Sequence, residues 1–396
     1  MRWSIVPMMM IGAALMPGRT DAQGRSGDIV RCVLSQPDQA GFSGVAAISR
    51  GPARWVHWRG AIGEAGSPPI TETTRFNIGS AGKMFTAVAI GQLIEAGKVR
   101  LDDQVGHFVD GLPPETAAVT VRQLLTHTSG LGNFFTPDAV PVLQNVRRLN
   151  DLMPLIAGER PRFIPGTQFD YSNTGFALLG MVVERASGQS YGDYLAAKIF
   201  QPAGMSATAL AYTAGATAQG LSAGNMPPRL LPPRGEPGSP SPGGGPRGLP
   251  SRDGPGPVAG GALHPAPEST MPATSAGGLF STAGDMTRFF LALSEGKLLG
   301  AETVRSFTMR QVDSAPAKGD LPALYYGFGF GTGSFEGHRW FGHNGGAPGV
   351  NAEAIMFPDD DLVIVVLANR DPPTATSLFR ALRAAVLRSG TAVPTC

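Results

Sequence analysis

The chain has 396 residues, and 42% of them are hydrophobic, which allows a sizeable core in one large domain or in two to three ordinary ones. The formal net charge is +2 at pH 7. A charge this small does not indicate nucleic acid or an anionic membrane surface as a partner.

The first residues have the pattern of a secretory signal peptide. Arg2 supplies a positive charge, residues 3–16 are mostly apolar, and residues 20–22 (Thr-Asp-Ala) offer small residues at both ends of a cleavage site. The apolar run is short for a membrane span, and no other segment approaches span length. We therefore expect residues 1–22 to be a signal peptide and the mature chain to be secreted or periplasmic. The alternative is an uncleaved N-terminal anchor.

The first part of the mature chain mixes strands and helices. The Gly51-Pro52 turn joins two runs with strand character, and Gly97 is a suitable residue just past a helix C-terminus. The patterns predict a helix, two strands and a second helix over residues 28–36, 44–49, 54–58 and 84–95.

The middle of the chain is predicted to be helical. Residues 120–123 (Thr-Val-Arg-Gln) form a capping box, residues 173–185 form an apolar helix, and Ser190 caps another helix that Pro202 ends. Residues 227–267 then hold 13 Pro and 10 Gly, a composition that cannot bury a core. We interpret them as a mobile insertion, either a surface excursion or a lid near the active site.

The last part of the chain is predicted to contain a run of strands with one helix before it and one after it. Ser281 or Thr282, with Asp285, caps a helix that runs to about Leu293. Four strands and a final helix are predicted over residues 325–331, 339–341, 351–357, 362–368 and 375–388.

Early and late strands around a helical middle predict an α/β (α+β) fold, with a sheet assembled from both ends of the chain. The sheet domain would comprise residues 23–85 and 270–396, and the inserted helical domain residues 86–226, with a cleft between them.

Two cysteines, Cys32 and Cys396, lie near the two ends of the mature chain. In an exported protein they could form a disulfide that closes almost the whole chain, provided that the termini lie side by side. The alternative is two unpaired thiols.

Ser80 and Lys83 are the first candidates for catalysis. Positions i and i+3 share one face of a helix, so the amine can reach the hydroxyl and take its proton. Only five of the 32 basic residues are lysines. A lysine in an apolar helix therefore indicates a group that can lose its proton, which arginine cannot. The alternative is a helix-capping serine followed by an unrelated lysine.

Two later segments carry the residue types that such a pair needs. Tyr171 could pass a proton between the serine and a leaving group, and Asn173 could orient a carbonyl and hold Lys83. Residues 340–346 (Trp-Phe-Gly-His-Asn-Gly-Gly) combine small residues with His343, so a substrate backbone could approach a strand edge there. The alternatives are a core aromatic at Tyr171 and an edge strand with a bulge.

The ordered motifs S-x-x-K at Ser80, Y-x-N at Tyr171 and H-x-G at His343 resemble the serine β-lactamase and penicillin-binding-protein superfamily. The likeness is closest to its class C β-lactamase-like branch, which includes D-Ala-D-Ala carboxypeptidases, D-aminopeptidases and related esterases. Residues 124–131 (Leu-Leu-Thr-His-Thr-Ser-Gly-Leu) and 277–282 (Gly-Gly-Leu-Phe-Ser-Thr) support it. The resemblance covers roughly residues 30–390.

The resemblance implies a β-lactamase/transpeptidase-like fold and a role for each motif. Ser80 would be the acylated nucleophile, with Lys83 and Tyr171 as general base and acid. The backbone N–H groups of Ser80 and Gly346 would form the oxyanion hole. Four further residues would bind the substrate: Asn173, His343, Asn344 and Gly345.

The third motif departs from the pattern of dedicated class C lactamases, which carry lysine where this chain has His343. A histidine is mostly neutral near pH 7, so it is a weaker partner for the carboxylate of a β-lactam. The substrate therefore stays open among an ester, a D-amino-acid peptide and a β-lactam. No metal-ligand spacing appears among the six histidines, and we expect no cofactor. We interpret His127 as a structural hydrogen-bonding residue. The competing hypothesis is a non-catalytic relative that binds peptidoglycan fragments or a protein partner.

Overall fold

The structure is a computed structural model that describes residues 29–36, 39–63, 66–143, 145–210, 273–316 and 324–388. The predicted signal peptide, the 227–267 insertion and Cys396 lie outside these residues. Cys32 is not a free thiol, but its bridge to Cys396 stays a prediction. None of the described helices combines the length and the apolar character that crossing a bilayer requires.

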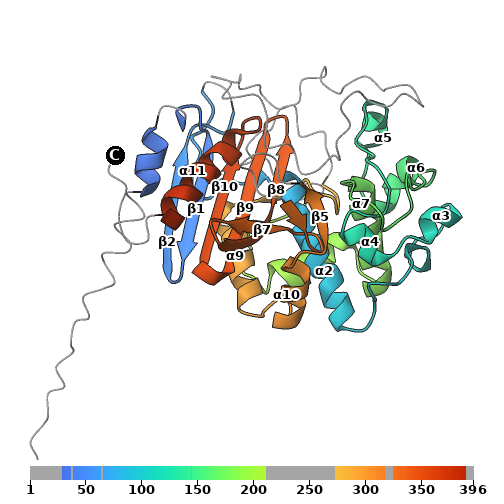
Figure 1. Cartoon of the computed structure of the whole chain (residues 1–396). Coiled ribbons are helices and arrows are strands. Elements are labelled where there is room, and N and C mark those ends of the chain that lie inside the picture. Colours follow the sequence, from blue (N-terminus) through green and yellow to red (C-terminus); the bar gives the residue numbers. More distant parts are fainter. Residues whose placement is uncertain are drawn as a thin grey trace, which may run out of the picture.

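An eight-stranded antiparallel sheet forms the centre of the fold, in the order β2-β1-β10-β9-β8-β7-β6-β5 (Figure 1). Its strands are β1 Gly44–Arg50, β2 Ala53–Arg59, β5 Val312–Ala315, β6 Leu324–Tyr326, β7 Gly331–Phe335, β8 His338–Ala347, β9 Val350–Phe357 and β10 Leu362–Ala368. β1 pairs directly with β10 along its whole length. The sheet is thus assembled from both ends of the chain, as the sequence predicts. A small second sheet pairs β3 (Phe76–Asn77) with β4 (Phe280–Ser281).

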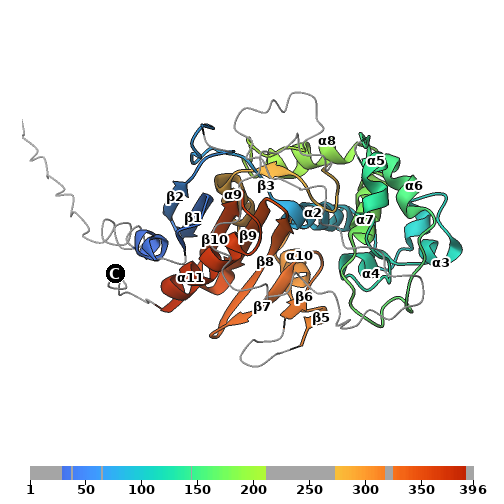
Figure 2. The ribbon, with the colours of Figure 1, turned by 90° about the horizontal axis from the view of Figure 1, so that it is seen from above.

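Helices flank this sheet and form a separate group at one side of it. The longer helices are α2 Lys83–Glu95, α7 Asn173–Ser187, α9 Ala283–Ser294, α10 Ala301–Thr308 and α11 Thr374–Arg388. The shorter ones are α3 Pro114–Ala117, α4 Val121–Leu125, α5 Val140–Leu143, α6 Met153–Ile156 and α8 Tyr191–Leu195. Both views place α3 to α7 together, beyond the β5–β8 side of the sheet, with α2 between this group and the strands (Figures 1 and 2).

Most predicted helix boundaries are confirmed by their caps. Thr120 forms the capping box with Gln123, Ser190 accepts from the N–H of Asp193, and Thr282 accepts from the N–H of Asp285. In each case a side-chain oxygen accepts one of the N–H groups that the first helical turn leaves unpaired. The N-terminal helix covers residues 29–35.

Both faces of the sheet are buried, which explains the nearly continuous apolar runs of β1 and β10. Val45 and Val365 belong to the core on the face that α2 and α9 cover, which we call the inner face. Ile48 and Ile364 belong to the core beneath α11 and residues 29–35, on the outer face. Successive side chains of a strand point to opposite faces, so each strand supplies both cores.

The strand predicted over residues 325–331 is wrong. The chain instead forms β6 and β7, because Gly327 to Phe330 make a tight turn closed by a hydrogen bond of 2.8 Å from the Gly327 N–H to the Phe330 carbonyl. Gly329 has a φ of 78°, a conformation that glycine adopts without strain. β5 and α10 were not predicted, and β8 is longer than the predicted strand over 339–341.

The extra length of β8 decides where the site lies. β7 pairs with β8 only as far as Gly342, so residues 343–347 pair with β9 alone. The inner face of this segment lies against the turn before α2. An ideal Cβ on Gly345 would stand 2.0 Å from the Ile78 carbonyl oxygen, so the close approach requires glycine there. The fold therefore presses the Ser80 turn against the inner face of β8, at the segment that β7 does not cover.

Candidate active site

Ser80 lies in a 3₁₀ turn, Gly79–Gly82, between β3 and α2. The Ile78 N–H donates to the Leu279 carbonyl, and the Gly278 N–H donates to the Gly79 carbonyl. The caps of the turn and of α2 are Ile78 and Gly82, with no side-chain hydrogen bond at either. The alternative that Ser80 is merely a helix cap is therefore wrong. Its side chain is partly exposed, as a nucleophile must be.

The Lys83 amine is fully buried and is held by three oxygen atoms. Nζ lies 3.2 Å from Ser80 Oγ, 2.7 Å from Asn173 Oδ1 and 2.6 Å from the Ala276 carbonyl oxygen. These partners come from α2's own turn, from the start of α7 and from the segment before β4. The S-x-x-K spacing therefore does bring the amine to the hydroxyl.

Burial lowers the pKa of Lys83 well below its usual value, because the charged form loses its hydration. No carboxylate pairs with Lys83 in the described part of the chain. The rings of Tyr171 and Phe176 lie 4.7 and 5.4 Å from Nζ, and ring faces attract a cation. Burial is the dominant effect on this pKa. A neutral amine has two N–H donors and one lone pair. The neutral Lys83 amine can donate to Asn173 Oδ1 and to the Ala276 carbonyl, and its lone pair can accept the proton of the Ser80 hydroxyl.

The Tyr171 hydroxyl is buried beside Ser80. It has no partner at hydrogen-bond geometry among the described residues, although Ser80 is near enough to act on its pKa. Burial raises the pKa of Tyr171 above its usual value, and Ser80 offsets only part of this shift. The phenol is therefore protonated at neutral pH. Lys83 and Tyr171 thus have pKa values shifted in opposite directions, which suits a base and an acid.

His127 fixes the backbone on both sides of Tyr171. The Ser172 N–H donates to His127 Nδ1 at 3.0 Å, and the Asp170 N–H donates to the His127 carbonyl at 2.9 Å. The ring also packs against that of Tyr171, with centroids 4.2 Å apart. Burial lowers the pKa of His127 well below its usual value, so Nδ1 is an acceptor and the ring stays neutral. The sequence interpretation of His127 as a structural hydrogen-bonding residue is confirmed.

Asn173 connects Lys83 to the rim of the site. Its Oδ1 accepts from Lys83, and its Nδ2 donates to Asn133 Oδ1 at 2.9 Å. Asn133 was missed in the sequence, because an exposed asparagine in a loop carries no distinctive pattern. The Ala276 carbonyl was missed for a similar reason, since backbone acceptors have no residue-type signal.

His343 lies on the inner face and does not present a cation. Its Nδ1 donates to the Asn344 carbonyl at 2.6 Å, so Nε2 accepts from the Tyr326 hydroxyl at 2.9 Å. Burial, with a smaller effect of Lys83, lowers the pKa of His343 to about 3. Tyr326 was not singled out from the sequence, because the strand predicted there was wrong.

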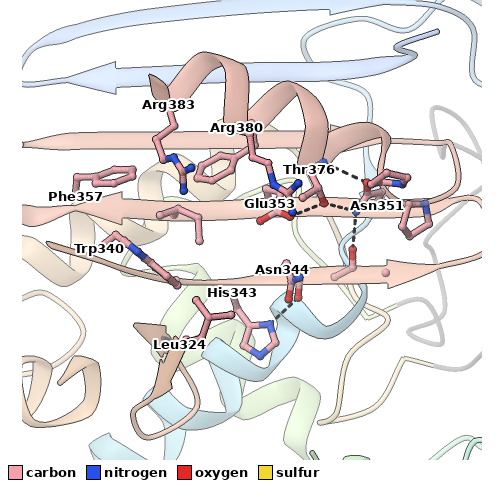
Figure 3. A pocket seen from close by; sticks show the side chains of 18 residues that line it. Leu324, Trp340, His343, Asn344, Asn351, Glu353, Phe357, Thr376, Arg380 and Arg383 are labelled. Carbon is pink, nitrogen blue, oxygen red and sulfur yellow. Dashed lines mark hydrogen bonds between the residues drawn. The ribbon is translucent and has the colours of Figure 1, made fainter. Parts of the chain in front are cut away.

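The remaining predicted residues of β8 separate into two groups. Gly345 and Gly346 lie against the Ser80 turn: an ideal Cβ on Gly79 would stand 3.1 Å from the Gly346 nitrogen. Asn344 alternates with His343, and its side chain faces α11 across the outer face (Figure 3). Its side chain is therefore not placed to bind a substrate at Ser80. No group of three or more metal-ligating side chains is found among the residues that the structure describes.

The chain that carries Ser80, Lys83 and Tyr171 is similar to known proteins over most of its length. The Beta-lactamase family model matches residues 29–387, which is most of the chain. The chain belongs to this family.

Some of the known proteins that the chain is similar to have hydrolytic or penicillin-binding names. Penicillin-binding protein 4* of Bacillus subtilis is 35% identical over 175 residues, covering 42% of this chain and 38% of that protein. The chain thus matches well under two thirds of that relative's length. A penicillin binding protein from Bacillus halodurans has a TM-score of 0.70 and 28% identity, with 91% and 98% of the chains covered. A D-stereospecific amidohydrolase from Streptomyces sp. has a TM-score of 0.66 and 25% identity, with 92% and 98% covered.

We expect His127→Leu to slow covalent labelling of Ser80 by a fluorophosphonate about tenfold or more, because Tyr171 loses its fixed position. His127→Asn should retain most of the rate, since the amide oxygen can replace Nδ1 and asparagine tolerates the φ of 57° at this position. Mass spectrometry gives the labelling rates. Equal slowing in both variants would show that the acceptor atom is not what matters.

We expect His343 to weaken the fold at acidic pH. Its pKa is about 3 in the native protein, against about 6.5 when unfolded. Between these values the unfolded state binds an extra proton, so the free energy of unfolding falls by about 1.4 kcal/mol per pH unit as pH decreases. Burial also lowers the pKa of His127, so this residue likewise decreases the free energy of unfolding as the pH falls.

Urea unfolding at several pH values in this range gives the slope of the unfolding free energy against pH. In His343→Gln this slope should be smaller than in the wild type by the amount that corresponds to about one proton. His107→Gln, at an exposed histidine, is the matched control for the change from imidazole to amide. An unchanged slope in His343→Gln would contradict the buried, neutral state of this ring.

Proposed function

We propose that this protein is an exported serine hydrolase that forms an acyl-enzyme on Ser80 and cleaves an amide or ester of a D-amino acid. The observation that carries the proposal is the buried Lys83 amine, held by two short hydrogen bonds and placed beside the serine hydroxyl. The predicted signal peptide supports export.

The chemistry divides among three side chains. Ser80 Oγ attacks the carbonyl carbon and forms a C–O bond while its proton passes to Lys83 Nζ. The N–H groups of Ser80 and Gly346 receive the developing negative charge of the carbonyl oxygen. Tyr171 then gives its proton to the leaving nitrogen or oxygen as that bond breaks, and Lys83 returns a proton to Tyr171.

Deacylation uses the same groups. A water molecule loses its proton to Lys83 and attacks the acyl carbon. The C–O bond to Ser80 breaks, the serine recovers a proton, and the free acid leaves. No step needs a metal ion or organic cofactor.

The surroundings of the third motif favour an amide or ester over a β-lactam. His343 is neutral and engaged with Tyr326, so it offers no positive charge to the carboxylate of a lactam. The likeness to the D-stereospecific amidohydrolase from Streptomyces supports a D-configured substrate. The open edge of β8 at residues 343–347 gives a peptide-like substrate a backbone to pair with.

We expect purified protein to hydrolyse D-phenylalanine p-nitroanilide faster than the L-isomer, p-nitrophenyl acetate measurably, and a chromogenic cephalosporin slowest. Ser80→Ala and Lys83→Arg should lower the rates by roughly 10³-fold or more, since arginine cannot lose its proton. Ser294→Ala, at an exposed serine on α9, is the matched control and should keep full activity.

No turnover of any of these substrates, together with no fluorophosphonate adduct on Ser80, would contradict the enzyme and favour the non-catalytic, peptidoglycan-binding alternative. Preference for the L-isomer would be consistent with Ser80 as the nucleophile but would contradict the proposed D-amino-acid substrate.

A further inference from the structure

Two buried polar side chains beside the catalytic groups take no part in the acyl transfer, His343 on β8 and Tyr326 on β6. The two rings meet edge to face, with centroids 5.8 Å apart, and the Tyr326 hydroxyl lies 2.9 Å from His343 Nε2. The ring of Tyr171 lies 6.2 Å from that of His343. This pair is therefore close enough to the reaction to act on the substrate.

The hydrogen bonds of His343 fix which of its atoms carries a proton. Nδ1 lies 2.6 Å from the Asn344 carbonyl, which can only accept, so Nδ1 holds the proton of the neutral ring (Figure 3). Nε2 then has a lone pair, which accepts from the Tyr326 hydroxyl. Burial, with a smaller effect of Tyr171, raises the pKa of Tyr326 well above its usual value, so the hydroxyl stays a donor in acid and at neutral pH. The phenol thus stabilises only the neutral imidazole.

A proton on Nε2 would place two donors against each other. The Tyr326 hydroxyl would have to turn its own proton away, and within the described residues it has no hydrogen-bond partner besides His343. The other titratable groups that the structure describes around this ring are Lys83 on α2, Tyr171 before α7 and His127 after α4. None of these three is an anion at neutral pH, so none of them favours a charged His343.

The leaving group of the substrate comes close to this pair. Tyr171 gives its proton to the leaving nitrogen or oxygen, so that atom must lie within hydrogen-bond distance of the Tyr171 hydroxyl. A carboxylate on the first carbon of the leaving group would therefore meet His343 as a neutral ring, whose acceptor atom Tyr326 already occupies. Such a carboxylate loses hydration there and gains no positive partner from His343 in return.

We propose that Tyr326 determines the specificity of the site, by restricting it to substrates with an uncharged leaving group. Tyr326 is a positioning residue that acts through His343. Because its hydroxyl keeps the ring neutral, simple amides and esters of a D-amino acid are cleaved in preference to peptides with a free carboxylate directly after the cleaved bond. This inference rests on the proposed acyl-enzyme function of Ser80 and narrows its substrate class.

Tyr326→Phe removes the hydroxyl and keeps the ring. The ring packs against those of His127 and Phe169, with centroids 4.7 and 5.8 Å apart, and phenylalanine can keep both contacts. Tyr325→Phe is the matched control. Tyr325 precedes Tyr326 on β6, so it points to the opposite face of the strand, where its ring lies 4.3 Å from the guanidinium of Arg310.

The test compares D-phenylalanyl-glycine with D-phenylalanyl-glycinamide, which differ only in the charge of the leaving group. Chromatography of the released phenylalanine gives kcat/KM for each. We expect the wild type to prefer the glycinamide about tenfold or more, the value of one charge-assisted hydrogen bond. In Tyr326→Phe this preference should shrink about tenfold as the pH falls from about 7 to about 5, because His343 can then take up a proton. Both substrates need the same neutral Lys83, so its titration cancels in the ratio.

The titration of His343 gives a second readout that does not depend on turnover. In protein labelled with ¹⁵N at histidine, His343→Gln assigns the signals of this ring among the six histidines. Tyr326→Phe should raise the pKa of His343 from about 3 by about one unit or more, since the neutral form loses its donor. Tyr325→Phe should leave this pKa unchanged.

In the His343→Gln background, Tyr326→Phe should no longer change the substrate ratio, whereas a merely structural effect of Tyr326 would persist. An unchanged pKa of His343, an unchanged ratio in Tyr326→Phe, or an equal change in Tyr325→Phe would overturn the proposal.

Turnover of neither dipeptide would contradict the proposed function instead, and the preference is then measured as binding. Calorimetry of Ser80→Ala with each dipeptide should show tighter binding of the glycinamide, and Tyr326→Phe in the same background should reduce the difference. Equal affinities of the two dipeptides for Ser80→Ala would overturn the role of Tyr326 as well.

Discussion

The site depends on one constraint, the burial of the Lys83 amine without a carboxylate partner among the residues that the structure describes. A lysine in this position costs folding free energy, because the charged form must give up its hydration or its proton. Three oxygen atoms from three separate segments, Ser80, Asn173 and Ala276, surround the nitrogen. The turn before α2, the start of α7 and the chain before β4 must therefore all be in place before the amine can act on the serine.

The backbone around Ser80 is organised by close approaches that only glycine permits. An ideal Cβ on Gly277 would stand 2.5 Å from the Gly79 carbonyl oxygen, and one on Gly345 would stand 2.0 Å from that of Ile78. Below and beside the nucleophile, the chain is thus packed backbone against backbone. β7 does not pair with residues 343–347 of β8, and His127 holds the backbone beside Tyr171 through Ser172.

Local patterns predicted the parts of the fold that depend on local chemistry. The i, i+3 spacing brings Lys83 to Ser80, and the side-chain caps of α4, α8 and α9 are where the sequence places them. The meeting of Asn173 with Lys83, 90 positions away, was predicted from the chemistry of the amide side chain and not from spacing. The Ala276 carbonyl and the Tyr326 partner of His343 could not be predicted. The first is a backbone group, and the second depends on a glycine turn that splits one apolar run into β6 and β7.

The protonation state of Lys83 is the most direct test of this account. The chain has only five lysines, so protein labelled with ¹³C at lysine Cε should give five signals to follow against pH, with Lys83→Arg assigning one of them. We predict that the Lys83 signal titrates well below the usual lysine pKa of about 10.4. If the Lys83 signal titrates near this usual value, the amine is a charged hydrogen-bond donor at neutral pH. It could not then be the base that activates Ser80.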